Sequence, residues 1–201
     1  MFCVGLTGNI ASGKSTVSQF FKNKGIVIIS ADEAAHELTK INQPALIAIE
    51  QHFGKEFIKP SGELNRLALR ETIFSDTKQR IWLEQLLHPL IRQYMQKKLH
   101  ESLGPYAIVE IPLLKKREDY PYLDRILLVF ASHEQVIERV IERDKSNRAQ
   151  VEAILAVQTR EDSSRRKLAD DIINNDGSIA DLAKKIEILH CQYLQFASQK
   201  S

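Results

Sequence analysis

The sequence predicts an α/β fold in which helices cover both faces of a parallel sheet of about five strands. Short apolar runs without clean alternation recur along the chain, and such runs are typical of strands buried on both faces. Helical patterns separate most of these runs, as in parallel sheets whose strands are joined by helices. A glycine-rich loop joins the first run to the first helical pattern. These three observations indicate a three-layer α/β/α architecture.

The predicted elements follow in order along the chain. The strands are expected at 2–6, 26–29, 107–111, 126–130 and 171–173. The helices outside the long gap between the second and third strands are expected at 14–24, 133–143, roughly 149–168 and 179–197. The first helix places Val17, Phe20 and Phe21 on one face, and Gly25 marks its end.

The loop after the first strand has the GxxxxGK[ST] pattern of a P-loop. It lies between a strand and a helix, which is the context that this motif requires. Gly8 and Gly13 permit backbone angles that a Cβ would forbid, so successive N–H groups can point at phosphate oxygens at the start of a helix. Lys14 is expected to reach the β- and γ-phosphates and Ser15 to ligate Mg²⁺. The residues predicted to bind a nucleoside triphosphate are Gly8, Asn9, Ile10, Ala11, Ser12, Gly13, Lys14, Ser15 and Thr16.

The stretch 31–104 is longer than a crossover between neighbouring strands requires. Its helical patterns lie at 31–40, 44–53, 66–74, 76–87 and 89–103. Decoration of the fold would give the same pattern, but we favour a substrate-binding insert, because ligands of open α/β folds bind beyond the carboxyl ends of the strands. The predicted nucleotide-binding core then comprises 1–30, 105–138 and 168–201, and the charge-rich stretch 139–167 forms a further region.

Composition limits the classes of function. A chain of 201 residues can bury one substantial core with an inserted subdomain. The net charge of +2 argues against a dominant nucleic-acid or membrane surface. Cys3 and Cys191 form no disulfide framework, and no apolar run approaches the ~20 residues of a membrane span. A cytoplasmic protein that acts on small molecules is expected, and the sequence is silent on its oligomeric state.

Several polar residues follow predicted strands at the edge that carries the P-loop. Asp32 is expected either to stabilise the first turn of a helix as part of a capping box with Ser30 and Glu33, or to act as a general base or water-mediated Mg²⁺ contact. Glu110 could contact Mg²⁺ through water or hydrogen-bond the P-loop. Asn175 could frame an adenine or simply belong to an Asn-Asp-Gly turn.

An ordered set of short motifs continues beyond the P-loop. It comprises Gly5-Leu6-Thr7-Gly8, Asp32, Gly54, Gly62, Arg66, Leu69, Leu83-Glu84, Leu87-His88-Pro89, Pro112-Leu113-Leu114, Arg143-Asp144, Gln158, Ala169-Asp170 and Asn175-Asp176-Gly177-Ser178. This order resembles the dephospho-CoA kinase family over nearly the whole chain. The chain departs from the family's pattern at Ser30, Asn65, Lys115 and Lys116.

The resemblance implies transfer of the ATP γ-phosphoryl group to the ribose 3′-hydroxyl of dephospho-CoA, with Mg²⁺. Lys14, Asp32 and Arg143 would be catalytic, Asp32 as the group that accepts or orients the hydroxyl proton and Arg143 as a charge-neutralising residue of a helical lid at 139–167. Arg143 and Asn175 would also bind ATP. The expected acceptor-binding residues are Asp32, His36, Arg66, His88 and Leu113. His88, which precedes Pro89, has a structural alternative as a helix cap or a packed core residue.

Two other functions fit the P-loop. Another small-molecule kinase, of the nucleoside monophosphate or shikimate type, would share the motif. This alternative does not account for the insert at 31–104. A nucleotide-dependent switch of the GTPase type usually carries Asn-Lys-x-Asp after a strand. The corresponding strand here ends in Val129-Phe130-Ala131-Ser132 instead.

Overall fold

The structure is a computed structural model that describes the chain except for residues 113, 145–146, 149–150, 153–154, 156–161 and 201. The chain divides into two compact units. Met1–Ile29 and Glu101–Ser201 form the first, which we call the sheet unit, and Ser30–His100 form the second, which we call the helical unit. Apart from its first residue, Ser30, the helical unit lies within the stretch 31–104 that was expected to form an insert.

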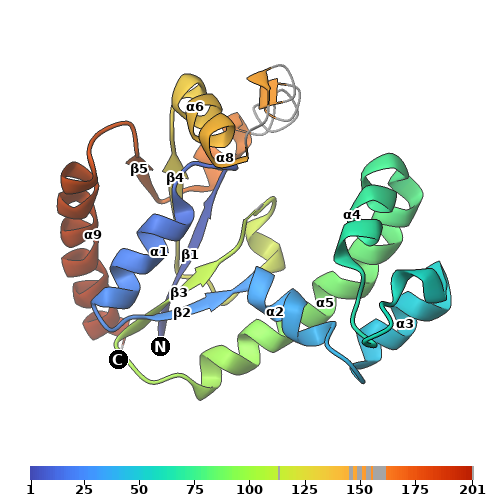
Figure 1. Ribbon diagram of the computed structural model, residues 1–201. Coiled ribbons are helices and arrows are strands. Elements are labelled where there is room, and N and C mark those ends of the chain that lie inside the picture. Colours follow the sequence, from blue (N-terminus) through green and yellow to red (C-terminus); the bar gives the residue numbers. More distant parts are fainter. Residues whose placement is uncertain (113, 145–146, 149–150, 153–154, 156–161, 201) are drawn as a thin grey trace. The chain divides into compact units, whose positions relative to one another are not determined.

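The sheet unit contains a five-stranded sheet and its flanking helices (Figure 1). Its elements are β1 (Phe2–Gly8), α1 (Lys14–Asn23), β2 (Val27–Ser30), β3 (Tyr106–Glu110), the short 3₁₀ helix η2 (Arg117–Asp119), β4 (Arg125–Phe130), α6 (His133–Asp144), α8 (Asp162–Leu168), β5 (Asp171–Asn174) and α9 (Ile179–Lys200). The strand order is β2-β3-β1-β4-β5, and β1 runs parallel to both β3 and β4. The predicted α/β class with five strands is confirmed.

β1 occupies the centre of the sheet. All seven of its residues are buried, and because alternate side chains point to opposite faces, both faces of the sheet are covered there. Its carboxyl end pairs Leu6 with Glu110 of β3 and Gly8 with Val129 of β4. This register brings the loop after β1 and the ends of β3 and β4 to the same edge of the sheet.

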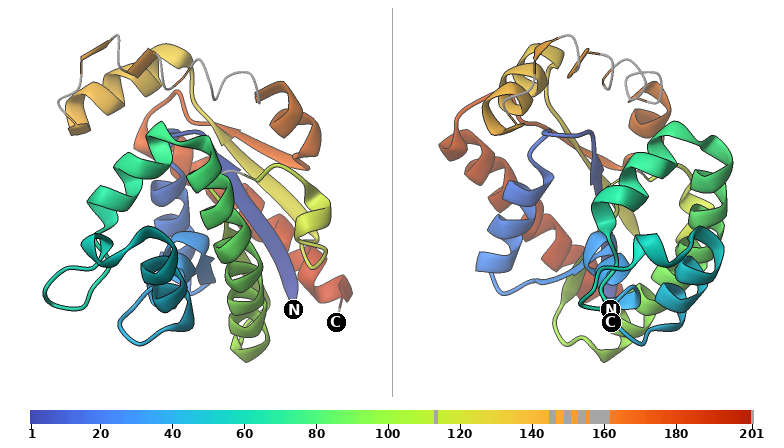
Figure 2. Two further views of the ribbon diagram at one scale, coloured as in Figure 1. Left: turned by 90° about the vertical axis from the view of Figure 1, so that its right-hand side faces the viewer. Right: turned by 45° about the vertical axis from the view of Figure 1, so that its right-hand side comes forward.

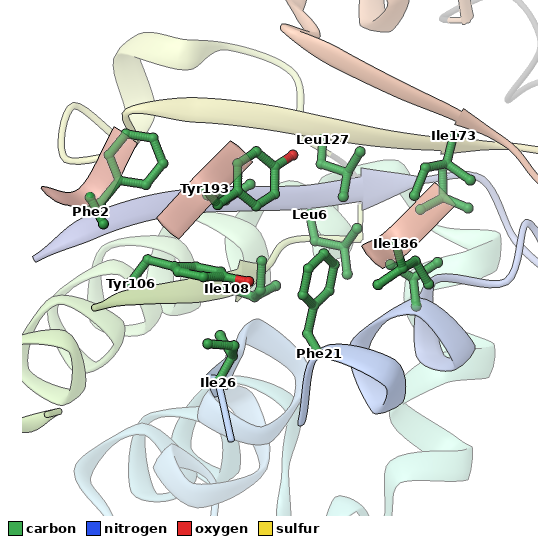
Figure 3. Close-up of a cluster of buried hydrophobic side chains, with 14 of the residues drawn as sticks. Phe2, Leu6, Phe21, Ile26, Tyr106, Ile108, Leu127, Ile173, Ile186 and Tyr193 are labelled. Atoms are coloured by element: carbon green, nitrogen blue, oxygen red, sulfur yellow. The ribbon is translucent and has the colours of Figure 1, made fainter. Parts of the chain in front are cut away.

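The main core packs α1 and α9 against one face of the sheet. Phe21 of α1 and Tyr193 of α9 are both fully buried, and their rings stack with centroids 6.2 Å apart. Figure 3 labels both side chains in this core. Tyr106 of β3 meets both rings edge-on. The chain ends lie side by side at the opposite end of this unit from the P-loop (Figure 2). The packing of these aromatic rings fixes α1, the helix that follows the P-loop.

Cys3 belongs to the core. Its side chain is buried in β1, and desolvation, followed by the charge of Asp124, raises the pKa of its thiol to about 11. A thiol with so high a pKa is almost entirely protonated at neutral pH and therefore a poor nucleophile. Cys3 is therefore a small buried core residue.

The helical unit contains α2 (Ala31–Leu38), α3 (Pro44–Phe53), η1 (Lys55–Phe57), α4 (Arg66–Ser75) and α5 (Thr77–Glu101). Its own core joins α3, α4 and α5 through Ile49, Leu69 and Leu83, among others. The hydroxyl of Ser30 accepts a hydrogen bond from the backbone N–H of Glu33, as predicted for the N-cap of α2.

One helix prediction was wrong. The sequence indicated two helices that meet at His88-Pro89, whereas α5 runs without a break through Pro89. A proline inside a helix costs about 3 kcal/mol. Burial of Leu83 before the proline, and of Met95 and Leu99 after it, holds both halves of α5 in place and offsets this cost.

Half of the residues of the helix predicted at roughly 149–168 lie outside the described residues, and α8 covers its last part. The lid assignment for 139–167 therefore stays a prediction. Among the residues that the structure describes, no helix combines the length and the apolar character needed to span a membrane.

Candidate active site

The P-loop joins β1 to α1 in a conformation that few side chains allow. Gly13, which precedes α1, is left-handed with φ +97°, and Ala11 is left-handed with φ +52°. Left-handed backbone is costly for a residue with a Cβ, so Ala11 must be held by its surroundings. The loop ends at the N-terminus of a ten-residue helix, where free N–H groups and the helix dipole favour an anion.

Two residues from distant parts of the chain brace this loop. The buried side chain of Asn175 donates to the carbonyl oxygen of Ser12 at 2.9 Å. Arg139 of α6 donates to the carbonyl oxygens of Ala11 at 3.3 Å and of Asn175 at 2.9 Å. These hydrogen bonds hold the main chain of the left-handed segment from outside the motif. Sequence reasoning assigned no such role to Arg139.

Gly13→Ala is expected to destabilise the protein and to remove nucleotide binding. A Cβ at this position would lie 2.2 Å from Nδ2 of Asn175, a side chain that its hydrogen bond holds in place. Together with the left-handed backbone, the clash should cost about 2–4 kcal/mol. Thermal unfolding and ATP binding by calorimetry measure the two effects.

Gly25→Ala is the matched control for this variant. Gly25 also has a positive φ, +78°, but beyond its two neighbours in the chain no atom of the described residues lies within 4 Å of the point that a Cβ would occupy there. Its substitution should therefore cost only about 1 kcal/mol and leave ATP binding unchanged. Equal losses for the two variants would show that the contact with Asn175 is unimportant.

Lys14 lies in the first turn of α1 with its side chain directed back over the loop. Its Nζ donates to the carbonyl oxygens of Gly8 at 2.7 Å and of Asn9 at 2.8 Å. The ammonium group is thus held beside the concave side of the loop, where phosphate oxygens would be bound. The contact of Lys14 with the β- and γ-phosphates stays a prediction.

The candidate Mg²⁺ ligands are hard oxygen donors. Ser15 is exposed at the start of α1, and one turn later the hydroxyl of Ser18 donates to Oε2 of Glu110 at 2.9 Å. Among the described residues, no group of three or more His, Cys, Asp or Glu side chains could hold a metal by itself. Mg²⁺ usually keeps several waters and binds through one or two protein oxygens and substrate phosphates, so Ser15 and Glu110 fit this ion.

The helical unit carries Asp32 and His36 on α2. Both side chains are exposed, Asp32 in the first turn and His36 in the last. Near the end of the same helix Glu37 pairs with Lys40, with Oε1 and Nζ 2.6 Å apart, and this hydrogen bond lowers the pKa of the Glu37 carboxyl. α2 therefore has an acid at its start and basic groups near its end, an order that suits the helix dipole.

A cavity of about 590 Å³ opens in the helical unit. It is lined by His36, Thr39, Lys40, Ile41, Lys59, Glu63, Leu64, Asn65, Arg66 and Leu67. Two of the predicted acceptor-binding residues, His36 and Arg66, thus share one cavity. Nη2 of Arg66 donates to the buried hydroxyl oxygen of Thr39 at 2.7 Å, which fixes the guanidinium at the wall. The lining combines basic and apolar side chains.

The remaining predicted site residues lie elsewhere. His88 is exposed in the interior of α5, so its alternatives as a helix cap or a packed core residue are wrong. Leu113 lies outside the described residues. Arg143 is exposed in the last turn of α6, one turn after Arg139. Asn175 braces the P-loop through its side chain, and its contact with ATP stays a prediction.

Together these features can bind a polyphosphate and bring a cation to it. The loop supplies N–H groups, Lys14 supplies a positive charge, and Ser15 and Glu110 supply oxygens for Mg²⁺. Such a set stabilises charge on a transferring phosphoryl group without covalent chemistry.

Comparison with known proteins agrees with this chemistry. The family model described as dephospho-CoA kinase matches residues 2–181. The chain is 44% identical to the dephospho-CoA kinase of Legionella pneumophila (strain Paris) over 200 residues, which cover 100% of this chain and 99% of that protein. It is 44% identical to the Salmonella typhimurium (strain LT2) dephospho-CoA kinase over 199 residues, with 98% and 96% covered.

Solved structures show the same relationship. The structure of dephospho-CoA kinase from Campylobacter jejuni superposes with a TM-score of 0.72 and 27% identity, covering 96% of this chain and 97% of that one. A shikimate kinase from Acinetobacter baumannii has a TM-score of 0.54 at 13% identity, with 96% and 94% covered, and shows a likeness of fold alone.

Proposed function

This chain belongs to the dephospho-CoA kinase family and is an ATP-dependent kinase of coenzyme A biosynthesis, and from that premise we propose what each site residue contributes to the reaction. The reaction transfers the γ-phosphoryl group of ATP to the ribose 3′-hydroxyl of dephospho-CoA. The observation that carries the proposal is the braced P-loop of the sheet unit, with Lys14 directed over it.

The P-loop residues Gly8 to Thr16 bind the phosphates of ATP. Their N–H groups and Lys14 offset the charge of the β- and γ-phosphates, and Arg139 and Asn175 restrain the main chain of the loop. Arg143, from the predicted lid, adds charge compensation when the transferring group is most negative. Asn175 contributes to the ATP site from the turn after β5.

Ser15 and Glu110 would hold Mg²⁺, because both offer hard oxygen donors. When bound, Mg²⁺ would stabilise negative charge on the phosphate oxygens during phosphoryl transfer. The hydrogen bond from Ser18 keeps the Glu110 carboxylate next to α1, where the same helix presents Ser15.

The helical unit binds dephospho-CoA. Its cavity offers basic groups at Lys40, Lys59 and Arg66 and apolar walls at Leu64 and Leu67. A molecule with a diphosphate and a long uncharged arm needs both kinds of surface. Asp32 accepts or orients the proton of the 3′-hydroxyl, and His36, His88 and Leu113 complete the proposed acceptor contacts.

The substrates are small molecules. The net charge of +2 supports this view over a nucleic-acid partner, and we place the enzyme in the cytoplasm, where free thiols such as that of the exposed Cys191 persist.

An acceptor screen tests the function. ADP release from ATP and Mg²⁺ is measured with dephospho-CoA, with shikimate, with nucleoside monophosphates and without acceptor. Release that depends on dephospho-CoA is expected. Release that depends on shikimate or a nucleotide would favour another kinase, and release without any acceptor would favour a nucleotide-dependent switch.

Arg66→Ala is expected to raise KM for dephospho-CoA about 10-fold to 100-fold, because a charged hydrogen-bond donor to a phosphate is removed. KM for ATP should not change. Arg70→Ala is the control, since Arg70 is also exposed on α4 but does not line the cavity. Steady-state kinetics with each substrate varied distinguishes the two, and an unchanged KM for dephospho-CoA in Arg66→Ala would contradict the assignment.

A further inference from the structure

A buried arginine reaches the P-loop from α8. The side chain of Arg165 is only 2% exposed, although burial of a charged group is costly unless it is well bonded. Its Nη1 donates to the side-chain oxygen Oδ1 of Asn9, the second residue of the P-loop motif. Its neighbour Arg166 instead lies over the ring of Phe130, with Cζ 4.0 Å from the ring centroid. α8 thus directs one of two adjacent arginines to the loop.

Asn9 is held at both ends. Arg165 binds its side chain, while its carbonyl oxygen accepts from Nζ of Lys14 at 2.8 Å and from the backbone N–H of Ser12 at 3.2 Å. Movement of Asn9 would therefore displace a carbonyl oxygen to which the Lys14 ammonium is bonded. The planar guanidinium suits this task because its donors are rigidly arranged.

We propose that Arg165 is a positioning residue for the phosphoryl-transfer reaction. It fixes Asn9, and through Asn9 it sets the part of the P-loop main chain on which Lys14 rests. The proposal depends on the proposed use of this loop for ATP. Arg165 acts through Asn9 and not by its own contact with substrate, so the two residues form one functional unit.

A double-mutant cycle tests the proposal. Arg165→Gln, Asn9→Ala and the double variant are compared for kcat and for KM with each substrate, together with thermal unfolding. Loss of a hydrogen bond from a charged donor predicts that each single variant lowers kcat/KM for ATP about 10-fold to 100-fold. KM for dephospho-CoA should stay unchanged. Because both variants break the same link, the double variant should be no worse than either single one.

Arg166→Gln is the matched control on the same helix, and its kinetics should equal those of the unaltered enzyme. Multiplicative losses in the double variant, or full activity of Asn9→Ala, would overturn the proposal. Asn9→Ala also keeps the test valid if Arg165→Gln does not fold, because it leaves the buried arginine in place. If Lys14→Ala is inactive but Asn9→Ala is unaffected, this proposal fails and the proposed function stands; an active Lys14→Ala would refute the function itself.

Discussion

Lys14→Ala is expected to lower kcat by at least about 10²–10³-fold, the effect of removing one preorganised donor from a charge-stabilising site. Lys14 is the one P-loop side chain whose ammonium group rests on the carbonyl oxygens of Gly8 and Asn9. Among the described residues of the motif no other side chain carries a positive charge. Its loss removes charge compensation from the transferring phosphoryl group. The measurement is steady-state ADP release, with dephospho-CoA and Mg²⁺ saturating.

The fold of this variant should stay intact. The brace of the loop comes from Arg139 and Asn175, whose bonds to the main chain do not involve the Lys14 side chain. Lys22→Ala serves as the control, since Lys22 is exposed in the last turn of the same helix. Unchanged turnover in Lys14→Ala, or a loss matched by Lys22→Ala, would refute the assignment of the P-loop.

The P-loop was predictable because its signal is local. Strand, loop and helix follow one another in the sequence, and the glycine at position 13 has the left-handed backbone that the motif requires. The cap of α2 by Ser30 is equally local, since donor and acceptor lie within one helical turn. Residues whose partners are their neighbours in sequence therefore carried most of the correct predictions.

The support of the site was not predictable, because it depends on distant pairs. Arg139 bonds to Ala11 across 128 positions, Asn175 to Ser12 across 163 and Arg165 to Asn9 across 156. In the sequence these arginines belong to a run of mixed charge that looks like a solvated helix face. These residues reach the loop only because β4 pairs with β1, and β5 pairs with β4, in the folded sheet.

For α5 a local signal in the sequence led to a wrong prediction. A proline is a strong local signal for a helix boundary, yet here tertiary packing overrides it. Leu83 belongs to the core of the helical unit, and Met95 and Leu99 are buried farther along. Local propensity of about 3 kcal/mol is smaller than the gain from burying several large apolar side chains, each about 1.5–3 kcal/mol.

The second large effect is expected at Asp32. Asp32→Asn should lower kcat by about 10²–10⁴-fold, the usual contribution of a positioned general base or orienting carboxylate. The amide has almost the same size, so α2 should keep its structure, but it cannot accept a proton and orients a hydroxyl group poorly. Asp32 is exposed in the first turn of that helix, which leaves its carboxylate accessible to a substrate.

Comparing the change in kcat with the change in the dissociation constant of ATP decides between the roles left open for Asp32. If it serves the acceptor hydroxyl, the dissociation constant of ATP should change by less than about 2-fold while kcat collapses. If it only stabilised the helix dipole, Asp32→Asn would cost about 0.3–1 kcal/mol of stability and kcat would hold. Glu33→Gln is the matched control, because Glu33 is an acid in the same first turn. A loss of ATP affinity alone would make Asp32 a nucleotide contact, and equal losses for both variants would make it a helix-stabilising acid.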